Sequence, residues 1–130
     1  MPRLHVLAVA ARLPAWAEAA CTDYARRMPR GYEIERISVR KIGKLPRGRV
    51  VVLDEKGKDL TTRQFAALLK TEAVFVIGGA DGLDEEVKQQ ADLLLRLSAL
   101  TLPHALAQVI LLEQLYRAAT ILTGHPYHRA

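Results

Sequence analysis

The end of the chain carries side chains that could do chemistry. Residues 124–129 bring an aromatic ring, two imidazoles and a guanidinium together in the order Gly124, His125, Pro126, Tyr127, His128 and Arg129. Arginine and aromatic side chains suit contacts with phosphates and bases. Chain ends are usually polar and frayed, so this composition favours a functional tail over an ordinary terminus.

A glycine-rich turn is the second candidate. Gly78, Gly79 and Gly82 follow the apolar run 74–77 and precede a helix that Asp84 is expected to cap. Glycines at such a turn let a ligand approach the backbone, and the start of a helix offers free N–H groups. The spacing matches neither the dinucleotide-binding fingerprint nor a P-loop. A purely steric role for these glycines is an equally open alternative.

The apolar runs place both features on an α/β fold. We expect strands at residues 4–10, 33–40, 50–54 and 74–77. Strands that alternate with helices predict a mostly parallel sheet flanked by helices on both faces. At 130 residues the chain has the usual size of a single domain, residues 1–130. Ligands of open parallel sheets bind beyond the carboxyl ends of the strands, which adds the strand end at Leu53 and Asp54 to the candidate site.

The expected helices follow the same logic. Pro14 and Pro103 suit first helical turns, and Thr61 or Thr62 suits the cap of a helix that runs to Lys70. The buried face of the first helix is expected to carry the apolar residues that recur every four positions, namely Trp16, Ala20, Tyr24 and Met28. Residues 55–59 are expected to form a loop.

A basic segment separates the second and third expected strands. Residues 40–49 carry five positive charges and no acidic residue, from Arg40, Lys41, Lys44, Arg47 and Arg49. Two glycines and a proline in the same segment predict a loop. The segment is a candidate for contacts with phosphates, and a solvated turn is the alternative.

The last helix predicts a second copy of the chain. Its polar residues Glu113, Gln114, Arg117 and Thr120 lie within about a third of its circumference, and nearly all other positions are apolar. A surface helix needs one apolar stripe, so a helix with two covered sides indicates a homodimer. Complete burial inside a monomer is the alternative.

Composition limits the partners, the cellular compartment and the metals that can be expected. A formal charge of +5 permits a polyanionic partner. The single thiol, Cys21, cannot form an internal disulfide, so we expect a small buried residue in a cytoplasmic protein. No apolar run reaches the roughly 18 residues of a membrane span, so no membrane is expected. The four histidines have no cysteine or acidic neighbours in metal-ligand spacing, and we expect no metal.

Three segments together resemble a known enzyme family. They are residues 76–83 (VIGGADGL), residues 97–104 (LSALTLPH), and residues 113–118 (EQLYRA) running on to the tail HPYHR. Their order and spacing are similar to the ribosomal RNA large subunit methyltransferase H family. Members of that family are SPOUT-class enzymes that methylate N3 of a pseudouridine in large-subunit rRNA. The resemblance extends over nearly the whole chain.

The resemblance implies a fold, a cofactor and an assembly. The architecture would be an α/β knot, a C-terminal trefoil knot in which the last helix threads through a loop. The enzyme would be a homodimer that uses S-adenosyl-L-methionine and acts on the rRNA of the large ribosomal subunit. The family's cofactor contacts carry over to Leu53, Gly78, Leu97, Ser98, Ala99, Leu100, Thr101 and Leu102.

The resemblance also implies roles for the tail. Tyr127, His128 and Arg129 would approach the active site across the dimer interface. The uracil N3–H must lose its proton before the nitrogen can attack a methyl group, and a positive charge stabilises the developing anion. Arg129 is the candidate for that charge, with His128 as proton relay and Tyr127 positioning the base. His104 is a second candidate for the proton, with a structural role at a helix start as the equal alternative.

The chain departs from the family in one place. Family members carry a longer segment, with an additional helix, where this chain has only residues 40–49. Cofactor binding should survive that loss, whereas docking to the ribosome, and with it the exact substrate, no longer follows from the resemblance. Two alternatives therefore stay open: a non-catalytic factor that binds RNA or the ribosome, and a SPOUT methyltransferase that acts on another RNA such as tRNA.

Overall fold

The computed structural model describes residues 3–9 and 12–127 of the chain. A five-stranded sheet with the order β2-β1-β4-β3-β5 forms its centre, and every paired strand is parallel to its neighbour. The strands are β1 (Leu4–Val9), β2 (Ile34–Val39), β3 (Arg49–Asp59), β4 (Ala73–Gly78) and β5 (Leu93–Arg96). The helices are α1 (Ala15–Arg26), α2 (Thr62–Ala67), α3 (Glu85–Gln89) and α4 (His104–Thr123), with a 3₁₀ turn, η1 (Leu68–Lys70), after α2.

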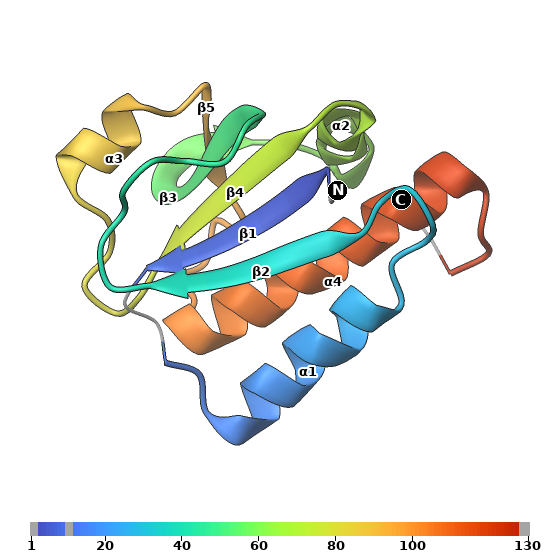
Figure 1. Ribbon diagram of the computed structural model, residues 1–130, viewed down its shortest axis with the longest axis horizontal. Helices are drawn as coiled ribbons and strands as arrows, with labels where there is room; N and C mark the ends of the chain where they lie inside the picture. Colours follow the sequence, from blue (N-terminus) through green and yellow to red (C-terminus); the bar gives the residue numbers. More distant parts are fainter. Residues whose placement is uncertain (1–2, 10–11, 128–130) are drawn as a thin grey trace.

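The two faces of the sheet are covered unequally. Side chains of a strand alternate between faces, and in β1 Leu4, Val6 and Ala8 join the core shared with α1, α2 and α4. Leu7 points to the other face, where Val87 of the five-residue α3 joins a smaller cluster. Figure 1 shows α1 and α4 side by side along one face and the short α3 apart from them. The prediction of a parallel sheet flanked by helices is confirmed.

The apolar character of α4 is explained largely by burial in the core. Leu111, Leu112 and Leu115 are fully buried. By length and composition α4 could cross a membrane, because its mean hydropathy is 1.2, but half of that stretch is buried within the protein. A core helix has the same composition, so the hydropathy of α4 is weak evidence for a membrane.

Three expectations about local structure need correction. Trp16 is 57% exposed, whereas Tyr24 and Met28 pack in the core as expected, together with Ala17 and Cys21. The residues at four-residue spacing therefore lie on a face that is exposed at Trp16 and reaches the core only toward the end of the helix. The helix after Asp84 is expected to run to about residue 92, but it ends at Gln89. The predicted loop at residues 55–59 is wrong, because β3 continues to Asp59.

The extension of β3 contains a large bulge against β5. Leu95 of β5 pairs with Leu53 and again with Lys58, so residues 54–57 of β3 have no counterparts in β5. At Gly57 the backbones almost touch: a Cβ there would lie 2.7 Å from backbone atoms of Leu94 and Leu95. Only glycine allows this approach, and bulges of this kind turn side chains toward neighbouring sites. This contact went unrecognised in the sequence because it joins residues far apart in the chain.

A short crossover, which we call the basic strap (residues 40–49), joins β2 to β3. The strands are parallel, so the chain must return the length of the sheet and also pass β1 and β4. From the register, that path is about 22 Å long, whereas nine residues span about 14 Å as a helix and about 30 Å when extended. The crossover is accordingly free of helix. It ends at Gly48 (φ +131°), where a Cβ would lie 2.8 Å from the carbonyl carbon of Glu72.

The threading of α4 through a loop, which the family resemblance implies, stays a prediction.

The Gly57 contact generates a stability prediction. Gly57→Ala should lower the free energy of unfolding by about 1–3 kcal/mol, because its Cβ would collide with backbone that cannot rotate away. Gly43→Ala is the matched control, since nothing lies within 4 Å of a Cβ there. It should change stability by less than about 1 kcal/mol. Urea denaturation measures both, and equal stability of the two variants would contradict the assigned role of Gly57.

Candidate active site

A cavity of about 710 Å³ opens at the carboxyl ends of β4 and β5 and at the start of the bulge in β3. This volume lies in the usual range for sites that hold small molecules and cofactors. Three separate segments form most of its lining: residues 53–55, residues 77–83, and residues 95–104 without Ala99. Lys88 of α3 and Ala107 of α4 complete it. The position agrees with the general rule that open parallel sheets bind ligands at this edge.

The glycine turn after β4 forms one wall of the cavity. The Gly82 N–H donates to the carbonyl of Gly79 at 3.0 Å, and Gly82 has a φ of +76° that favours glycine. A Cβ on Gly78 would lie 2.8 Å from the backbone of Gly82. Gly78 therefore has a steric role in closing the turn, in addition to its place beside the cavity.

The loop between β5 and α4 forms the opposite wall. Within it the Leu100 N–H donates to Ser98 Oγ at 2.9 Å, while the Leu100 side chain is 77% exposed. The loop leads through Pro103, the N-cap residue, into α4. The first N–H groups of a helix lack intrahelical partners and carry partial positive charge. The start of this 20-residue helix therefore suits an anionic or electron-rich ligand group in the cavity.

An ion pair adds charge to the cavity lining. Asp54 Oδ1 lies 3.8 Å from Lys88 Nζ, and the Asp54 side chain is only 11% exposed. Asp54 belongs to the bulge of β3, so the contact at Gly57 also determines where this carboxylate lies. Sequence reasoning identified Asp54 as a strand end but missed Lys88. No motif marks the pair, because its two partners lie in distant parts of the chain.

Arg96, a lining residue at the end of β5, ties that strand to the end of β3. Its Nε and Nη2 donate to the two carboxylate oxygens of Asp59 at 2.7 and 2.6 Å. These hydrogen bonds lower the pKa of Asp59. This pair of hydrogen bonds holds the point at which residues 97–102 leave the sheet.

The described part of the tail lies away from this cavity and folds back onto α4. After Gly124 the chain turns, and the Tyr127 hydroxyl donates to Glu113 Oε2 at 2.8 Å. Arg117 Nη2 donates to the same oxygen at 2.7 Å, and its guanidinium lies 5.0 Å from the centre of the Tyr127 ring. Glu113 is nine residues beyond His104, or about 14 Å along the helix axis.

The structure thus brings most of the expected cofactor residues together. Leu53, Gly78, Leu97, Ser98, Leu100, Thr101 and Leu102 line one cavity, and so does His104. Ala99 is exposed and is not among the lining residues. Tyr127 lies outside the lining of the cavity, and His128 and Arg129 lie outside the described residues. Within residues 3–9 and 12–127, no group of three histidine, cysteine or acidic residues could hold a metal ion.

Tyr127 generates a prediction about pH. Burial, together with the hydrogen bond to the Glu113 carboxylate, raises the pKa of Tyr127 above its usual value. The phenol hydroxyl therefore stays a donor throughout the neutral range, and its contribution to stability is lost only as the pH rises past the ordinary tyrosine pKa of about 10. A spectroscopic titration of the native protein minus the Tyr127→Phe variant should show tyrosinate only above that pH. In denaturant, the tyrosine absent from the variant should titrate with a pKa of about 10. A native difference signal already at that pH would contradict the contact.

Comparison with known proteins identifies the family. Residues 2–128 match the family described as "Predicted SPOUT methyltransferase". The ribosomal RNA large subunit methyltransferase H of Paraburkholderia phymatum is 46% identical over 154 aligned positions, which cover 98% of this chain and 99% of the relative. That of Dechloromonas aromatica is 46% identical over 156 positions, covering 98% of each chain. Both alignments are longer than the 130 residues of this chain, so the relatives contain residues that it lacks.

Solved structures support the same fold. A protein of Haemophilus influenzae Rd KW20 described as "a probable methylase family protein" superimposes with a TM-score of 0.66 at 11% identity, over 99% of this chain and 71% of the other. The SpoU methyltransferase AviRb from Streptomyces viridochromogenes, in complex with the cofactor AdoMet, gives a TM-score of 0.56 at 15% identity, over 92% and 60%. With the family match and the 46% identical relatives, these findings show that the chain belongs to the SPOUT methyltransferases, in the ribosomal RNA large subunit methyltransferase H family.

Proposed function

We propose that this protein methylates N3 of a pseudouridine in the rRNA of the large ribosomal subunit, with S-adenosyl-L-methionine as methyl donor. The observation that carries the proposal is the cavity itself. It gathers the glycine turn and residues 97–104, the segments that resemble the family, at the edge of the sheet where ligands bind. Relatives with 46% identity over nearly their whole length are named as methyltransferases of large-subunit ribosomal RNA.

The cavity suits S-adenosyl-L-methionine in size and in chemistry. Leu53, Leu97 and Leu102 offer apolar contacts to a flat base. Asp54 offers carboxylate oxygens to ribose hydroxyls, and the start of α4 offers N–H groups to a carboxylate. Gly78 and the remaining residues of the loop, Ser98 to Thr101, complete the proposed binding set. When bound, this cofactor supplies an electrophilic methyl group.

In the proposed mechanism the protein aligns the substrate and manages one proton. Alignment and exclusion of water account for most of what a methyl transfer needs. Arg129 stabilises the negative charge that develops on the uracil ring as the N3–H proton leaves. His128 accepts that proton, and Tyr127 positions the base. His104 at the cavity wall is the second candidate for the proton.

We further propose that the working enzyme is a cytoplasmic homodimer. Tyr127 is held on Glu113, well along α4 from the cavity, which supports a tail that serves the cavity of the partner subunit. Trp16 (57% exposed) and Leu106 (38%) stand in the first turns of α1 and α4, which pack together and both begin at the carboxyl edge of the sheet. A second copy would cover these side chains.

The tail generates the main test of function. Wild-type protein with S-adenosyl-L-methionine should methylate large ribosomal subunits that carry the pseudouridine unmethylated, and mass spectrometry of the rRNA should locate the methyl group at N3. Arg129→Ala should keep cofactor affinity, measured by calorimetry, and lose methyl transfer by about 100-fold or more, as expected when charge stabilisation is removed. Unchanged turnover would reject the role of Arg129. Cofactor binding without any methylated nucleotide in wild type would reject the proposed substrate.

The apolar surface generates a test of assembly. The protein has a single tryptophan, so its fluorescence reports the environment of Trp16 alone. Sedimentation should give the mass of a dimer, and dilution should shift the emission to longer wavelength as Trp16 becomes exposed. Leu106→Ser should weaken the dimer, whereas Ala67→Ser, an exposed site on α2, should not. A wild-type monomer at all concentrations would reject the homodimer.

A further inference from the structure

The basic strap presents positive charge that the rest of the protein does not neutralise. All five of its basic residues are exposed. None of their side chains makes an ion pair or hydrogen bond with any residue in the described part of the chain. Elsewhere, Arg36, Arg96 and Arg117 are each paired with a carboxylate. The charges of the strap therefore remain available to an external anion.

Two apolar residues fix the orientation of the strap. Ile42 and Leu45 are partly buried and pack on the cluster that contains Leu7, Val52 and Val76, on the face of the sheet away from α1. The crossover is too short to form a helix, so it lies over this face in an extended form. With Ile42 and Leu45 directed inward, Lys41 and Lys44 are directed to solvent. The packing of Ile42 and Leu45 therefore determines that the basic side chains of the strap face solvent.

The strap begins close to the cavity. Val39, the last residue of β2, pairs with Val9 of β1, and Val9 pairs with Gly78 at the cavity wall. Two strand spacings separate Val39 from Gly78, or about 10 Å. The strap therefore leaves the edge of the sheet that carries the cavity and ends at Arg49, beside Ala73 at the opposite edge.

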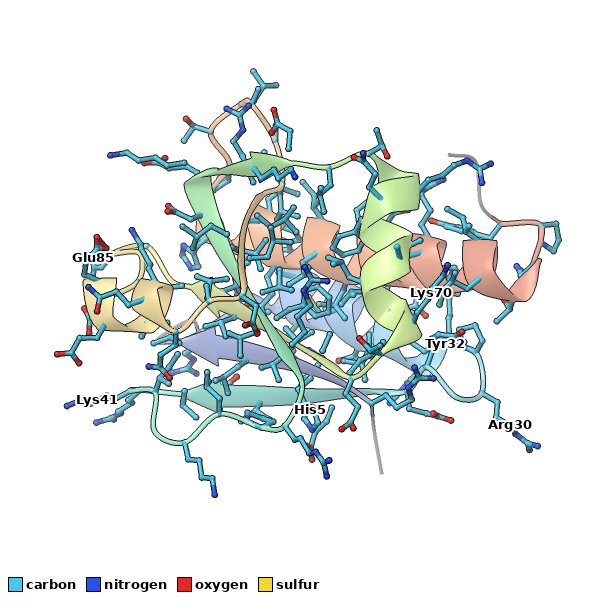
Figure 2. All side chains as sticks on the ribbon, turned by 90° about the horizontal axis from the view of Figure 1, so that it is seen from above. His5, Arg30, Tyr32, Lys41, Lys70 and Glu85 are labelled. Atoms are coloured by element: carbon cyan, nitrogen blue, oxygen red, sulfur yellow. The ribbon has the colours of Figure 1, made fainter. Side chains whose placement is uncertain are left out.

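The surroundings of the strap limit which part of it carries net charge. Figure 2 shows Lys41 at the same end of the molecule as Glu85, while Arg30, Tyr32 and Lys70 lie at the opposite end. Glu85 and Glu86 in the first turn of α3 offset some positive charge at the cavity end. At the far end of the strap the Val50 N–H donates to Asp92 Oδ2, so a carboxylate lies close to Arg49 as well. Lys44 lies between these two ends in the chain and is exposed.

We propose that the basic strap binds the phosphate backbone of the rRNA that flanks the target nucleotide. The inference rests on the proposed function, since the RNA must enter the cavity about 10 Å from the start of the strap. A row of unpaired lysines and arginines on an extended backbone provides contacts with successive phosphates that do not depend on base sequence. In this role the strap supplies RNA affinity from a segment that is too short to form a helix.

The test compares two variants with the same change in charge. Lys41→Ser with Lys44→Ser removes two charges from the strap, and Arg30→Ser with Lys70→Ser removes two exposed charges at the opposite end. The probe is a protein-free, fluorescently labelled rRNA hairpin that contains the pseudouridine, and its affinity is measured over a range of salt concentrations. The strap variant should bind less tightly, and its slope of log affinity against log salt should be smaller by about one for each lost phosphate contact. The control should keep the wild-type slope.

Further measurements distinguish RNA binding by the strap from contact with ribosomal protein and from failure of the proposed function. Both variants should keep wild-type thermal stability and affinity for S-adenosyl-L-methionine. For methyl transfer, the strap variant should raise KM for RNA and leave kcat unchanged, because the strap does not contact the reacting atoms. Equal RNA affinity and slope in the two variants would overturn the proposal. Normal hairpin binding with impaired action on intact subunits would overturn it too, since the strap would then contact ribosomal protein. RNA binding that depends on the strap in a protein without methyl transfer would reject the proposed function alone.

Discussion

The contact between Gly57 and the backbone of Leu94 and Leu95 is the constraint on which the site depends. It allows β3 to bulge by four residues and then return to pair with β5 a second time. The bulge places Asp54 at the cavity wall, where it meets Lys88. The second pairing brings Asp59 to Arg96, which holds the start of the loop between β5 and α4 that lines the cavity. A side chain at position 57 would disturb both walls at once.

Local sequence signals predicted the elements that depend on local interactions. Thr61 caps α2 through a reciprocal pair of hydrogen bonds with Gln64, and Pro103 immediately precedes α4, both as expected. Ile34 to Val39 alternate in character because β2 lies at the edge of the sheet. The features that were missed depend on long-range contacts. Residues 55–59 resemble a loop because their strand pairing comes from β5. Trp16 has the spacing of a core residue, but the core at that turn of α1 is filled by Ala17 and Cys21.

The site divides in the same way. The glycine turn and residues 97–104 could be singled out because each segment is compact in sequence, and both line the cavity. Lys88 could not, because its role depends on Asp54 across the sheet. The tail shows a third case. Its unusual composition was visible, and so was the polar stripe on α4, but the hydrogen bond from Tyr127 to Glu113 that joins them appears only in three dimensions.

The crossover between β2 and β3 has an uneven tolerance to changes of length. An added residue only loosens a path that already has enough reach, and a longer insertion could form a helix over the same face. Removing residues has the opposite effect: each loss shortens the reach by about 3.3 Å, and after about three the chain could no longer pass over the side chains of β1 and β4 while both ends stay paired. This position therefore accepts growth far more readily than shrinkage, and the present chain lies near its lower limit.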